Sequence, residues 1–315
     1  MDRSLFSVVI VTHNRRHIIA RAILSALAQE GGSPEVVVVD DASTDGTARY
    51  VTTVFPTVRF HRRERAEGPS ICRNFGMRLA TGRWVVVLDD DDELRPDALR
   101  TITDRLSGFA DAEKYPVLKF RRSDGTLTVP FQLSRVPDLT SSVRHGDFAS
   151  VWNRELALAQ GLGYPEHFIG AEGIVWIELA ERYGLPTWAD CIVIAHWDAG
   201  SRLSDSDAEV RRAAEHAEVQ DDFVRLLKPY ESSGTARGIV TDRMVLSGVY
   251  SLLAGDRATT LSKAWTLLGR RPRAALKLAL ATALPTAVVI RRFHEQRRPQ
   301  EAEKARARLP DTGWE

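Results

Sequence analysis

The sequence is poor in cysteine and carries almost no net charge. Its two cysteines, Cys72 and Cys191, are too few for a disulfide framework and lack the spacing of a zinc site. They fit a reducing compartment, which predicts a cytoplasmic location. The formal net charge of +1 provides no argument for nucleic acid as a partner.

Signal peptides and glycine-rich phosphate loops are also absent from the sequence pattern. Residues 1–5 lead into a strand-like segment without the basic and apolar parts of a signal peptide. No G-x-G-x-x-G and no P-loop follows the first strand, which argues against a dinucleotide site. Bound phosphates would therefore have to be held by a metal ion rather than by a glycine cradle.

The 315 residues, 43% of them hydrophobic, allow one large domain with a smaller addition. Strand and helix patterns alternate through roughly the first hundred residues, which predicts right-handed crossovers and an α/β fold with a mostly parallel open sheet flanked by helices. Asn14 is expected to cap the first helix. The expected strands are 6–11, 36–39, 58–61 and 83–88, and the expected helices include 16–29, a short one ending near 54, and 68–79.

The middle of the chain is less regular. Residues 117–121 and 127–131, separated by Ser123-Asp124-Gly125, predict a hairpin. A helix over 171–183 and a strand over 187–196 follow. From about residue 205 the composition turns to Ala, Leu, Arg and Glu with helical periodicity. We therefore expect an α/β domain over 1–204 and a helical C-terminal extension over 205–315.

Four consecutive carboxylates, Asp89 to Asp92, follow the apolar run Trp84–Leu88. Packed like charges repel, and their removal from water is costly unless a cation compensates. The pattern predicts a site for Mg²⁺ or Mn²⁺ that bridges to phosphates. The alternative is a solvated acidic turn before a helix that begins near Pro96.

Other strand ends also carry polar residues, namely Thr12-His13-Asn14 after the first strand and Asp40-Asp41 after the second. The carboxyl ends of parallel strands lie at one edge of a sheet and line one crevice. A crevice with these groups and a metal suits a nucleoside diphosphate.

Four segments, in this order and spacing, resemble the family 2 glycosyltransferases: residues 7–14, 38–47, 72–76 and 82–92, with a weaker likeness over 145–205. The resemblance implies the GT-A fold and a metal-dependent, inverting transfer of a sugar from a nucleotide-sugar donor, expected to be UDP-linked. The expected acceptor is a hydroxyl group, and polymeric, lipid-linked and small natural-product acceptors all remain open.

The resemblance implies roles on the donor side. Thr12 and Asp41 match positions that contact base and ribose, Arg73 lies in a segment that approaches the nucleotide, and Asp89 and Asp90 match positions that face ribose and phosphate. His13 and Asn14 share the strand end with Thr12. The structural alternatives are a helix cap for Thr12, an Asx turn for Asp41 and a solvated helix position for Arg73.

The same resemblance implies the metal ligands. Asp91 matches the last acid of the Asp-x-Asp motif, and His196 stands where a histidine completes the coordination of Mn²⁺ or Mg²⁺. Arg202, in a segment similar to the family's closing loop, would neutralise the diphosphate. The alternative for His196 is a hydrogen-bonded surface residue.

Glu172 is the expected catalytic base, because it matches the first acid of the family's Glu-Asp pair. Gly173 stands where the second acid is common, and Asp147 and Glu166 are the reserve candidates. The alternative is that Glu172 only favours a helix N-terminus.

Two other functions remain open. A sugar-phosphate nucleotidyltransferase would need a Gly-rich loop with a downstream Lys after the first strand, which residues 12–16 do not provide. A non-catalytic saccharide- or nucleotide-binding relative is suggested by Gly173.

Residues 270–298 combine an apolar stretch with arginine clusters. Lys277 and Pro285 interrupt the stretch, so it is too short and broken for a transmembrane span. It predicts a helix in the membrane interface, on the inner face, and a lipid-linked acceptor. The alternatives are packing on the catalytic domain and a dimer contact.

Overall fold

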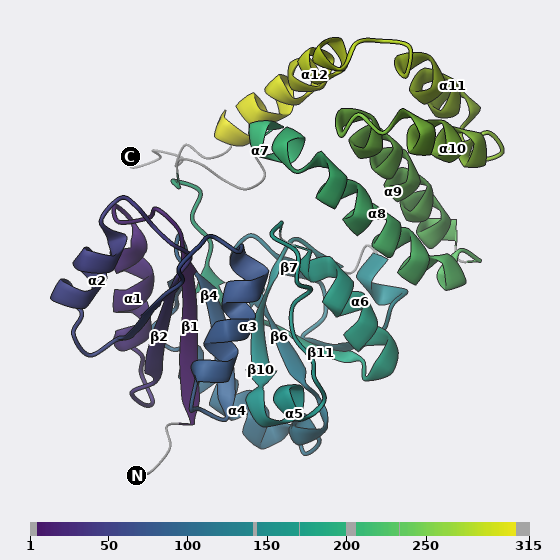
Figure 1. Cartoon of the computed structure of the whole chain (residues 1–315). Coiled ribbons are helices and arrows are strands. Elements are labelled where there is room, and N and C mark those ends of the chain that lie inside the picture. Colours follow the sequence, from purple (N-terminus) through teal and green to yellow (C-terminus); the bar gives the residue numbers. More distant parts are fainter. Residues whose placement is uncertain (1–4, 141–143, 170, 200–205, 233, 307–315) are drawn as a thin grey trace, which may run out of the picture. The chain divides into compact units, whose positions relative to one another are not determined.

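The computed structural model describes residues 5–140, 144–169, 171–199, 206–232 and 234–306. By its internal contacts the chain divides into two compact units, Met1–His196 and Trp197–Glu315. The first unit is an α/β domain and the second is helical (Figure 1). The boundary expected at residue 204 falls in a stretch outside the described residues.

The first four strands form the parallel half of a nine-stranded sheet, in the order β3-β2-β1-β4. Val9 of β1 is in register with Val37 of β2 and with Val87 of β4. All three side chains are buried, as expected for strands covered on both faces. The strands are β1 (Phe6–Thr12), β2 (Glu35–Asp40), β3 (Arg59–Arg62) and β4 (Trp84–Asp89).

The parallel arrangement expected from the first hundred residues is confirmed for β1 to β4, and beyond β4 the sheet becomes mixed. The next strand, β10, runs antiparallel to both β4 and β6. β11 is parallel to β6, and the short β5 and β8 are antiparallel to β11. The bounds are β5 (Glu93–Leu94), β6 (Val117–Arg122), β8 (Phe131–Ser134), β10 (Phe148–Asn153) and β11 (Leu185–Ile194).

The expected hairpin between 117–121 and 127–131 is wrong. β6 pairs with β10 and β11 instead, while β7 (Thr126–Leu127) pairs with β9 (Arg144–His145) in a separate two-stranded sheet. Leu118 and Lys119 of β6 are both almost completely buried. A strand buried on both faces needs long partners within the core, and a two-residue strand cannot supply them.

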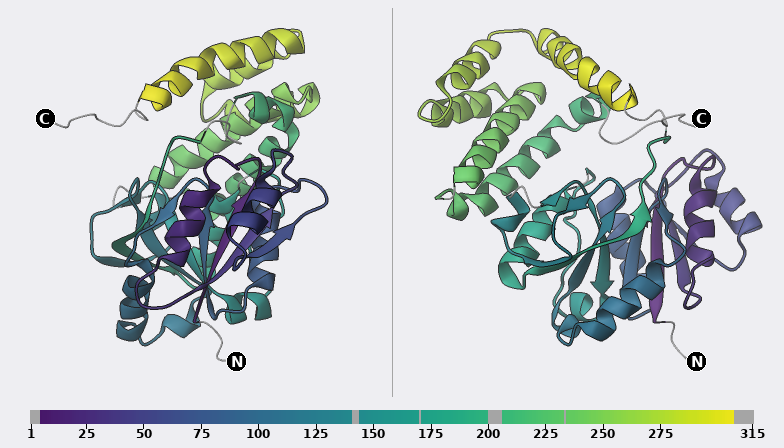
Figure 2. Two further views of the ribbon diagram at one scale, coloured as in Figure 1. Left: turned by 90° about the vertical axis from the view of Figure 1, so that its left-hand side faces the viewer. Right: turned by 180° about the vertical axis from the view of Figure 1, so that it is seen from behind.

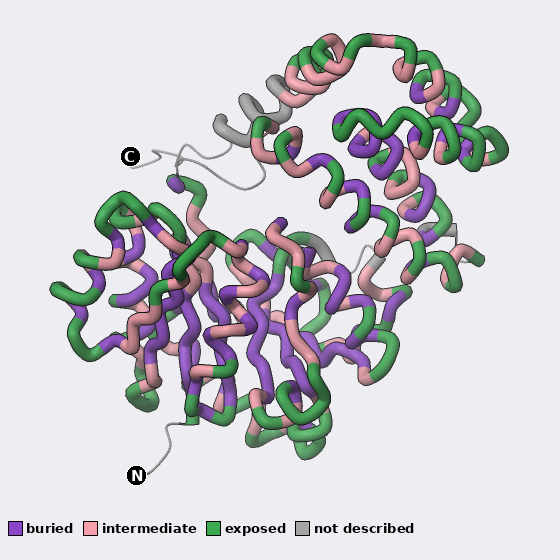
Figure 3. Tube along the Cα trace, viewed as in Figure 1, coloured by how far each residue is buried: buried purple, intermediate pink, exposed green. Residues whose placement is uncertain are grey.

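Helices cover both faces of the sheet (Figure 2). On one face, α1, α2 and α4 join the alternate strand residues Val8, Ile10 and Leu88 in the main hydrophobic core. On the other face, Gly76 of α3 packs against Val9. The strands are the most continuously buried part of this unit (Figure 3). The helices are α1 (Ile19–Leu27), α2 (Thr47–Val54), α3 (Pro69–Leu79), α4 (Ala98–Gly108), α5 (Arg154–Ala159) and α6 (Glu172–Arg182), with 3-10 turns at Ala112–Lys114 and Asp138–Thr140.

The first helix begins later than expected, and Asn14 does not cap it. Asn14 has a φ of 54°, in the left-handed region that asparagine tolerates. Its side-chain oxygen accepts a hydrogen bond from the backbone of Thr44, 2.7 Å away. The amide thus joins two loops instead of closing a helix end, and α1 starts at Ile19.

The second unit contains only helices and turns among its described residues. One apolar cluster includes Ala217 and Tyr250, and a second includes Leu267 and Leu278. None of the helices, over the part of the chain that the structure describes, has the length and apolar character needed to cross a membrane. The helices are α7 (Ser206–Arg211), α8 (Ala213–Leu227), α9 (Gly234–Leu253), α10 (Arg257–Leu267), α11 (Pro272–Ala281) and α12 (Thr286–Arg306), with a 3-10 turn at Lys228–Tyr230.

Candidate functional site

The acidic run lies at the carboxyl end of β4, where the buried strand reaches the sheet edge. Asp89 is its last residue and is partly exposed, whereas Asp90 and Asp92 are buried. The carbonyl oxygen of Asp91 accepts a hydrogen bond from the Arg21 guanidinium at 2.5 Å. The acids are therefore fixed parts of the fold rather than a solvated turn.

Arg73 of α3 connects this run to the start of α6. Its guanidinium donates to the Asp89 carboxylate at 2.7 Å and forms an ion pair with Glu172. It also lies over the ring of Tyr164, 5.3 Å from the centroid. With only 12% of its side chain exposed, Arg73 is a positioned charge and not a solvated helix residue.

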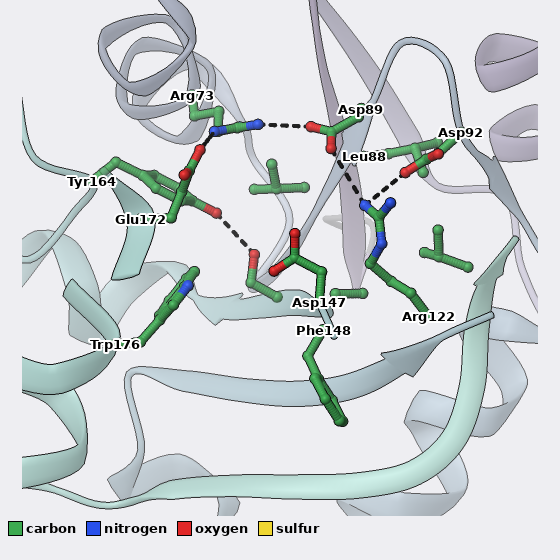
Figure 4. Close-up of a pocket in the computed structure, with 14 residues that line it drawn as sticks. Arg73, Leu88, Asp89, Asp92, Arg122, Asp147, Phe148, Tyr164, Glu172 and Trp176 are labelled. Carbon is green, nitrogen blue, oxygen red and sulfur yellow. Dashed lines mark hydrogen bonds and ion pairs between the residues drawn. The ribbon is translucent and has the colours of Figure 1, made fainter. Parts of the chain in front are cut away.

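Arg122, the last residue of β6, provides a second cation for the acids. One of its nitrogens, Nη1, lies 2.7 Å from Asp92 and 3.4 Å from Asp89. Its Nε also lies 3.2 Å from Asp124, and 16% of the side chain is exposed. The guanidinium therefore lies between two carboxylates of the run (Figure 4).

Burial and charge divide the acids into two groups. Burial acts to raise the pKa of Asp89, but the guanidinium groups of Arg73 and Arg122 outweigh it and hold that pKa below its ordinary value. Burial raises the pKa of Asp90 to about 7, although the Thr12 hydroxyl and Arg15 oppose the shift. Burial and the charge of Asp89 raise the pKa of Asp92 as well. Burial thus favours the protonated form of Asp90 and Asp92, while the two guanidinium groups favour the ionised form of Asp89.

Asp89, Asp91 and Asp92 fit a divalent cation. Each offers one carboxylate oxygen, and these oxygens lie within 4.8 Å of one another. Carboxylate oxygens are the ligands that Mg²⁺ and Mn²⁺ accept. His196 is not in this group of the described residues: its Nε2 lies 2.9 Å from the Glu93 carboxylate, and its backbone N–H donates to Asp92 at 3.1 Å.

The residues at the end of β1 join two loops at this edge. Thr12 is buried beside Asp90. Nδ1 of His13 lies 2.6 Å from the carbonyl oxygen of Asp41, and the backbone N–H of Asn14 donates to the Ser43 hydroxyl at 2.8 Å. The structure thus brings the predicted residues of the β1 and β2 ends together, and it gives each of them a structural contact.

Asp41 holds the beginning of α3. Its carboxylate accepts hydrogen bonds from the backbone N–H groups of Glu67 at 2.7 Å and Gly68 at 2.9 Å. Gly68 has a φ of 92°, and an added Cβ would lie 2.5 Å from the carbonyl oxygen of Phe168. Asp41 therefore has a clear structural role, and a contact with a nucleotide stays a prediction.

Arg73, Arg122, Asp89 and Asp92 line a cavity of about 110 Å³ on the α3 and α6 side of β4 (Figure 4). Glu172 lines it from the first turn of α6, and Asp147 lines it from the segment before β10. Glu166 is not among the lining residues of the cavity. The full lining is Arg73, Val87, Leu88, Asp89, Asp92, Arg122, Asp147, Phe148, Ala149, Ser150, Tyr164, Glu172, Trp176 and Val193.

Sequence reasoning missed Asn74, Arg122, Tyr164 and Trp176. Asn74 exchanges two 2.8 Å hydrogen bonds with the backbone of Tyr164, which fixes that ring under Arg73. Trp176 lies over the buried ammonium of Lys119, 3.6 Å from the ring centroid. Only Arg122 gave a usable signal, because it follows an expected strand in the same way as the acids do. Arg202 lies outside the described residues.

The mixed sheet, with acids at the end of the fourth strand, defines a GT-A-like fold. Two solved structures support that assignment of the fold alone. The chain is similar to Staphylococcus aureus TarS 1–349 in complex with UDP-GlcNAc, with a TM-score of 0.52 and 17% identity over 82% of this chain and 88% of that one. The chain is also similar to the mannosyltransferase PcManGT of Pyrobaculum calidifontis in complex with GDP-Man and Mn²⁺. That comparison has a TM-score of 0.50 and 19% identity over 93% of this chain and 87% of that one.

Residues 7–132 match the model of glycosyl transferase family 2. The chain is 42% identical over 136 residues to the succinoglycan biosynthesis protein ExoO of Rhizobium meliloti, covering 42% of this chain and 39% of that protein. It is 30% identical over 184 residues to a GalNAc(5)-diNAcBac-PP-undecaprenol beta-1,3-glucosyltransferase of Campylobacter jejuni. These residues cover 55% of this chain and 59% of that protein. The match thus spans between two-fifths and three-fifths of these relatives. The family match over residues 7–132 confirms the resemblance that the motifs predicted.

The name of a third relative includes both a donor and an acceptor. It is the UDP-Glc:alpha-D-GlcNAc-diphosphoundecaprenol beta-1,3-glucosyltransferase WfgD of Escherichia coli, 35% identical over 94 residues, which cover 29% of this chain and 37% of that protein.

Proposed function

We propose that this protein transfers a sugar from a UDP-linked donor to a hydroxyl group of a lipid-linked saccharide, with inversion at the anomeric carbon. The observation that carries the proposal is the cavity at the end of β4, where an aspartate cluster, two arginines and two further carboxylates meet. The names of two relatives, which include a diphosphate-linked undecaprenol, support the acceptor class.

The donor would bind with its diphosphate at the aspartate cluster. Asp89, Asp91 and Asp92 would hold Mn²⁺ or Mg²⁺, which when bound offsets the negative charge that develops on the departing diphosphate. Arg73 and Arg122 lie within the same cavity and can donate several hydrogen bonds to phosphate oxygens. Asp90 and Thr12 would lie next to the ribose, and Arg202 would be a further contact of the diphosphate.

His13, Asn14 and Asp41 would form the wall of the nucleotide site through the two loops that they join. His196 would act next to the metal site through Asp92 and Glu93, which it contacts. Its direct coordination of the ion would require the ring to leave Glu93.

A surface on the second unit is consistent with an acceptor held at a membrane. Trp265 is 76% exposed and Leu280 is 64% exposed. Together with the exposed side chains of Leu261, Leu268 and Leu276 they are what we call the α10–α11 surface, and the cations Arg273 and Lys277 of α11 are exposed as well. The two helices share one apolar cluster through Leu267 and Leu278. Exposed apolar side chains together with cations suit the interface of an anionic membrane. The residues of α11 lie within the expected range 270–298, whereas Leu261, Trp265 and Leu268 lie before it.

Vesicle flotation tests this contact. The full chain should float with vesicles that contain phosphatidylglycerol, and a Trp265→Ser, Leu280→Ser variant should float markedly less. Since both side chains are exposed, the variant should keep its melting temperature. Equal flotation of both proteins would rule out this surface as the membrane contact.

Donor binding and transfer test the main proposal. UDP with Mn²⁺ should raise the melting temperature more than GDP with Mn²⁺ does, because a ligand of the folded state stabilises it. UDP-glucose should then donate glucose to a synthetic GlcNAc-diphosphoundecaprenol. Release of pyrophosphate from a sugar phosphate and UTP would instead indicate the nucleotidyltransferase, and binding without any turnover would indicate the non-catalytic relative.

A further inference from the structure

The carboxylates in the cavity differ in their availability as a base. The Glu172 carboxylate is paired with Arg73, whose other side holds Asp89. Proton transfer to Glu172 would therefore remove the negative partner of a guanidinium that is almost completely buried. The position after it is Gly173, which has no side chain to share the task. Glu172 is thus better arranged to orient Arg73 than to accept a proton.

Asp147 lines the same cavity, but its surroundings differ from those of Glu172. Asp147 is exposed, and its carboxylate forms no ion pair or hydrogen bond with the residues that the structure describes. In Figure 4 its carboxylate points into the space between the Arg73–Glu172 pair and Arg122. It is therefore a carboxylate open to a substrate hydroxyl.

The backbone around Asp147 is held in place by two glycines. Gly146 has a φ of 74°, and an added Cβ would lie 2.5 Å from the carbonyl oxygen of Asp124. A Cβ on Gly125 would overlap the carbonyl oxygen of Asp147 itself. The pairing of β7 with β9 and the start of β10 fix the segment on its two sides. A base needs this kind of fixed backbone, because proton transfer depends on position within a few tenths of an ångström.

We propose that Asp147 is the catalytic base of the transfer reaction and that Glu172 is a positioning residue for Arg73. This rests on the proposed function. In the step, the acceptor O–H gives its proton to the Asp147 carboxylate as the acceptor oxygen bonds to the anomeric carbon. The bond from that carbon to the diphosphate oxygen breaks, and the electron pair leaves with the nucleoside diphosphate.

Three variants of the full chain test the assignment with UDP-glucose and GlcNAc-diphosphoundecaprenol. Asp147→Asn should lower kcat at least 100-fold, the range of general base catalysis, with less than a threefold change in the KM for UDP-glucose. Asp147→Glu should recover part of the rate, and its pH profile should keep the acidic limb that Asp147→Asn loses. Glu172→Gln should chiefly raise the KM for UDP-glucose, since it releases Arg73.

Glu155→Gln is the matched control, because Glu155 follows β10 at the end opposite to Asp147 and does not line the cavity. Its rate should equal that of the wild type, and Asp147→Asn and Asp147→Glu should share its melting temperature, whereas Glu172→Gln should melt lower because it breaks the buried pair with Arg73. A wild type that binds UDP but transfers no glucose would overturn both the proposed function and this one. A transferring wild type whose Asp147→Asn variant keeps its kcat, while Glu172→Gln loses kcat and the acidic limb, would overturn the assignment of Asp147 alone.

Discussion

Replacement of Arg122 by methionine should make the aspartate cluster bind Mn²⁺ more tightly in the absence of nucleotide. The guanidinium lies 2.7 Å from Asp92 and 3.4 Å from Asp89, two of the three residues that fit the metal. A cation that binds these carboxylates must displace it. Methionine keeps the apolar stem and removes the competing charge.

The size of the effect follows from these distances. At an effective dielectric constant of about 20, Coulomb attraction at 2.7 Å and 3.4 Å amounts to about 6 and 5 kcal/mol. Because only 16% of the Arg122 side chain is exposed, the cost of its desolvation offsets most of this attraction. Close charge pairs have measured couplings from about 1.5 kcal/mol upward, and that lower value corresponds to roughly a tenfold change in affinity.

Isothermal titration of the nucleotide-free protein with MnCl₂ measures the change directly. The Kd for Mn²⁺ should fall about tenfold in Arg122→Met. Arg121→Met is the control, because Arg121 is the preceding residue of β6 and donates to the carbonyl oxygen of Ala189 at 2.8 Å instead of to the acids. An unchanged or higher Kd in a folded Arg122→Met protein would refute the view that this arginine occupies the place of the metal.

Three further predictions concern stability. Gly76→Ala should cost about 1–3 kcal/mol of unfolding free energy, because its Cβ would overlap Val9, whereas Gly108→Ala, which meets nothing within 4 Å, should be nearly neutral in the same thermal melts. Asp41→Ala should cost about 3 kcal/mol in urea unfolding without any nucleotide, since two backbone N–H groups lose a charged acceptor. Although burial opposes it, hydrogen bonds from Ser7, Thr81 and Arg59 lower the pKa of Glu35. Its stabilisation is therefore present above the ordinary pKa of a glutamate and is lost as the pH falls through the lowered value, so Glu35→Gln should flatten the acid side of a plot of melting temperature against pH.

The sequence predicted β1, β2 and β4 well, because each is a short apolar run between turn residues, but it did not predict β10. The expected strand 6–11 appears as Phe6–Thr12 and the expected strand 83–88 as Trp84–Asp89. Strand direction and partners were harder to predict. Nothing in the local pattern of β10 indicates that it runs antiparallel between β4 and β6, so the hairpin at Gly125 looked reasonable and was wrong.

In the candidate site as well, local motifs could be predicted from the sequence and contacts between distant segments could not. The acids of 89–92 and Glu172 were found because they stand in ordered motifs, and the structure places Asp89, Asp92 and Glu172 around one cavity with Arg73. Arg122 and Tyr164 come from distant segments and reach the cavity only through the fold. Likewise, the sequence could not show that the ring of His196 contacts Glu93, because that contact depends on the neighbouring strands β11 and β5.

The contact between Gly68 and Phe168 has a consequence for altering this enzyme. The helix α3 carries Arg73, which we propose to contact the donor, while the chain after Phe168 leads into α6, and the two backbones touch where no side chain fits. On that proposal, a designer who exchanges the segment before α6 to accept a new saccharide would also move the guanidinium of Arg73. Grafts that leave residues 161–168 untouched and vary only positions further along α6 avoid that coupling.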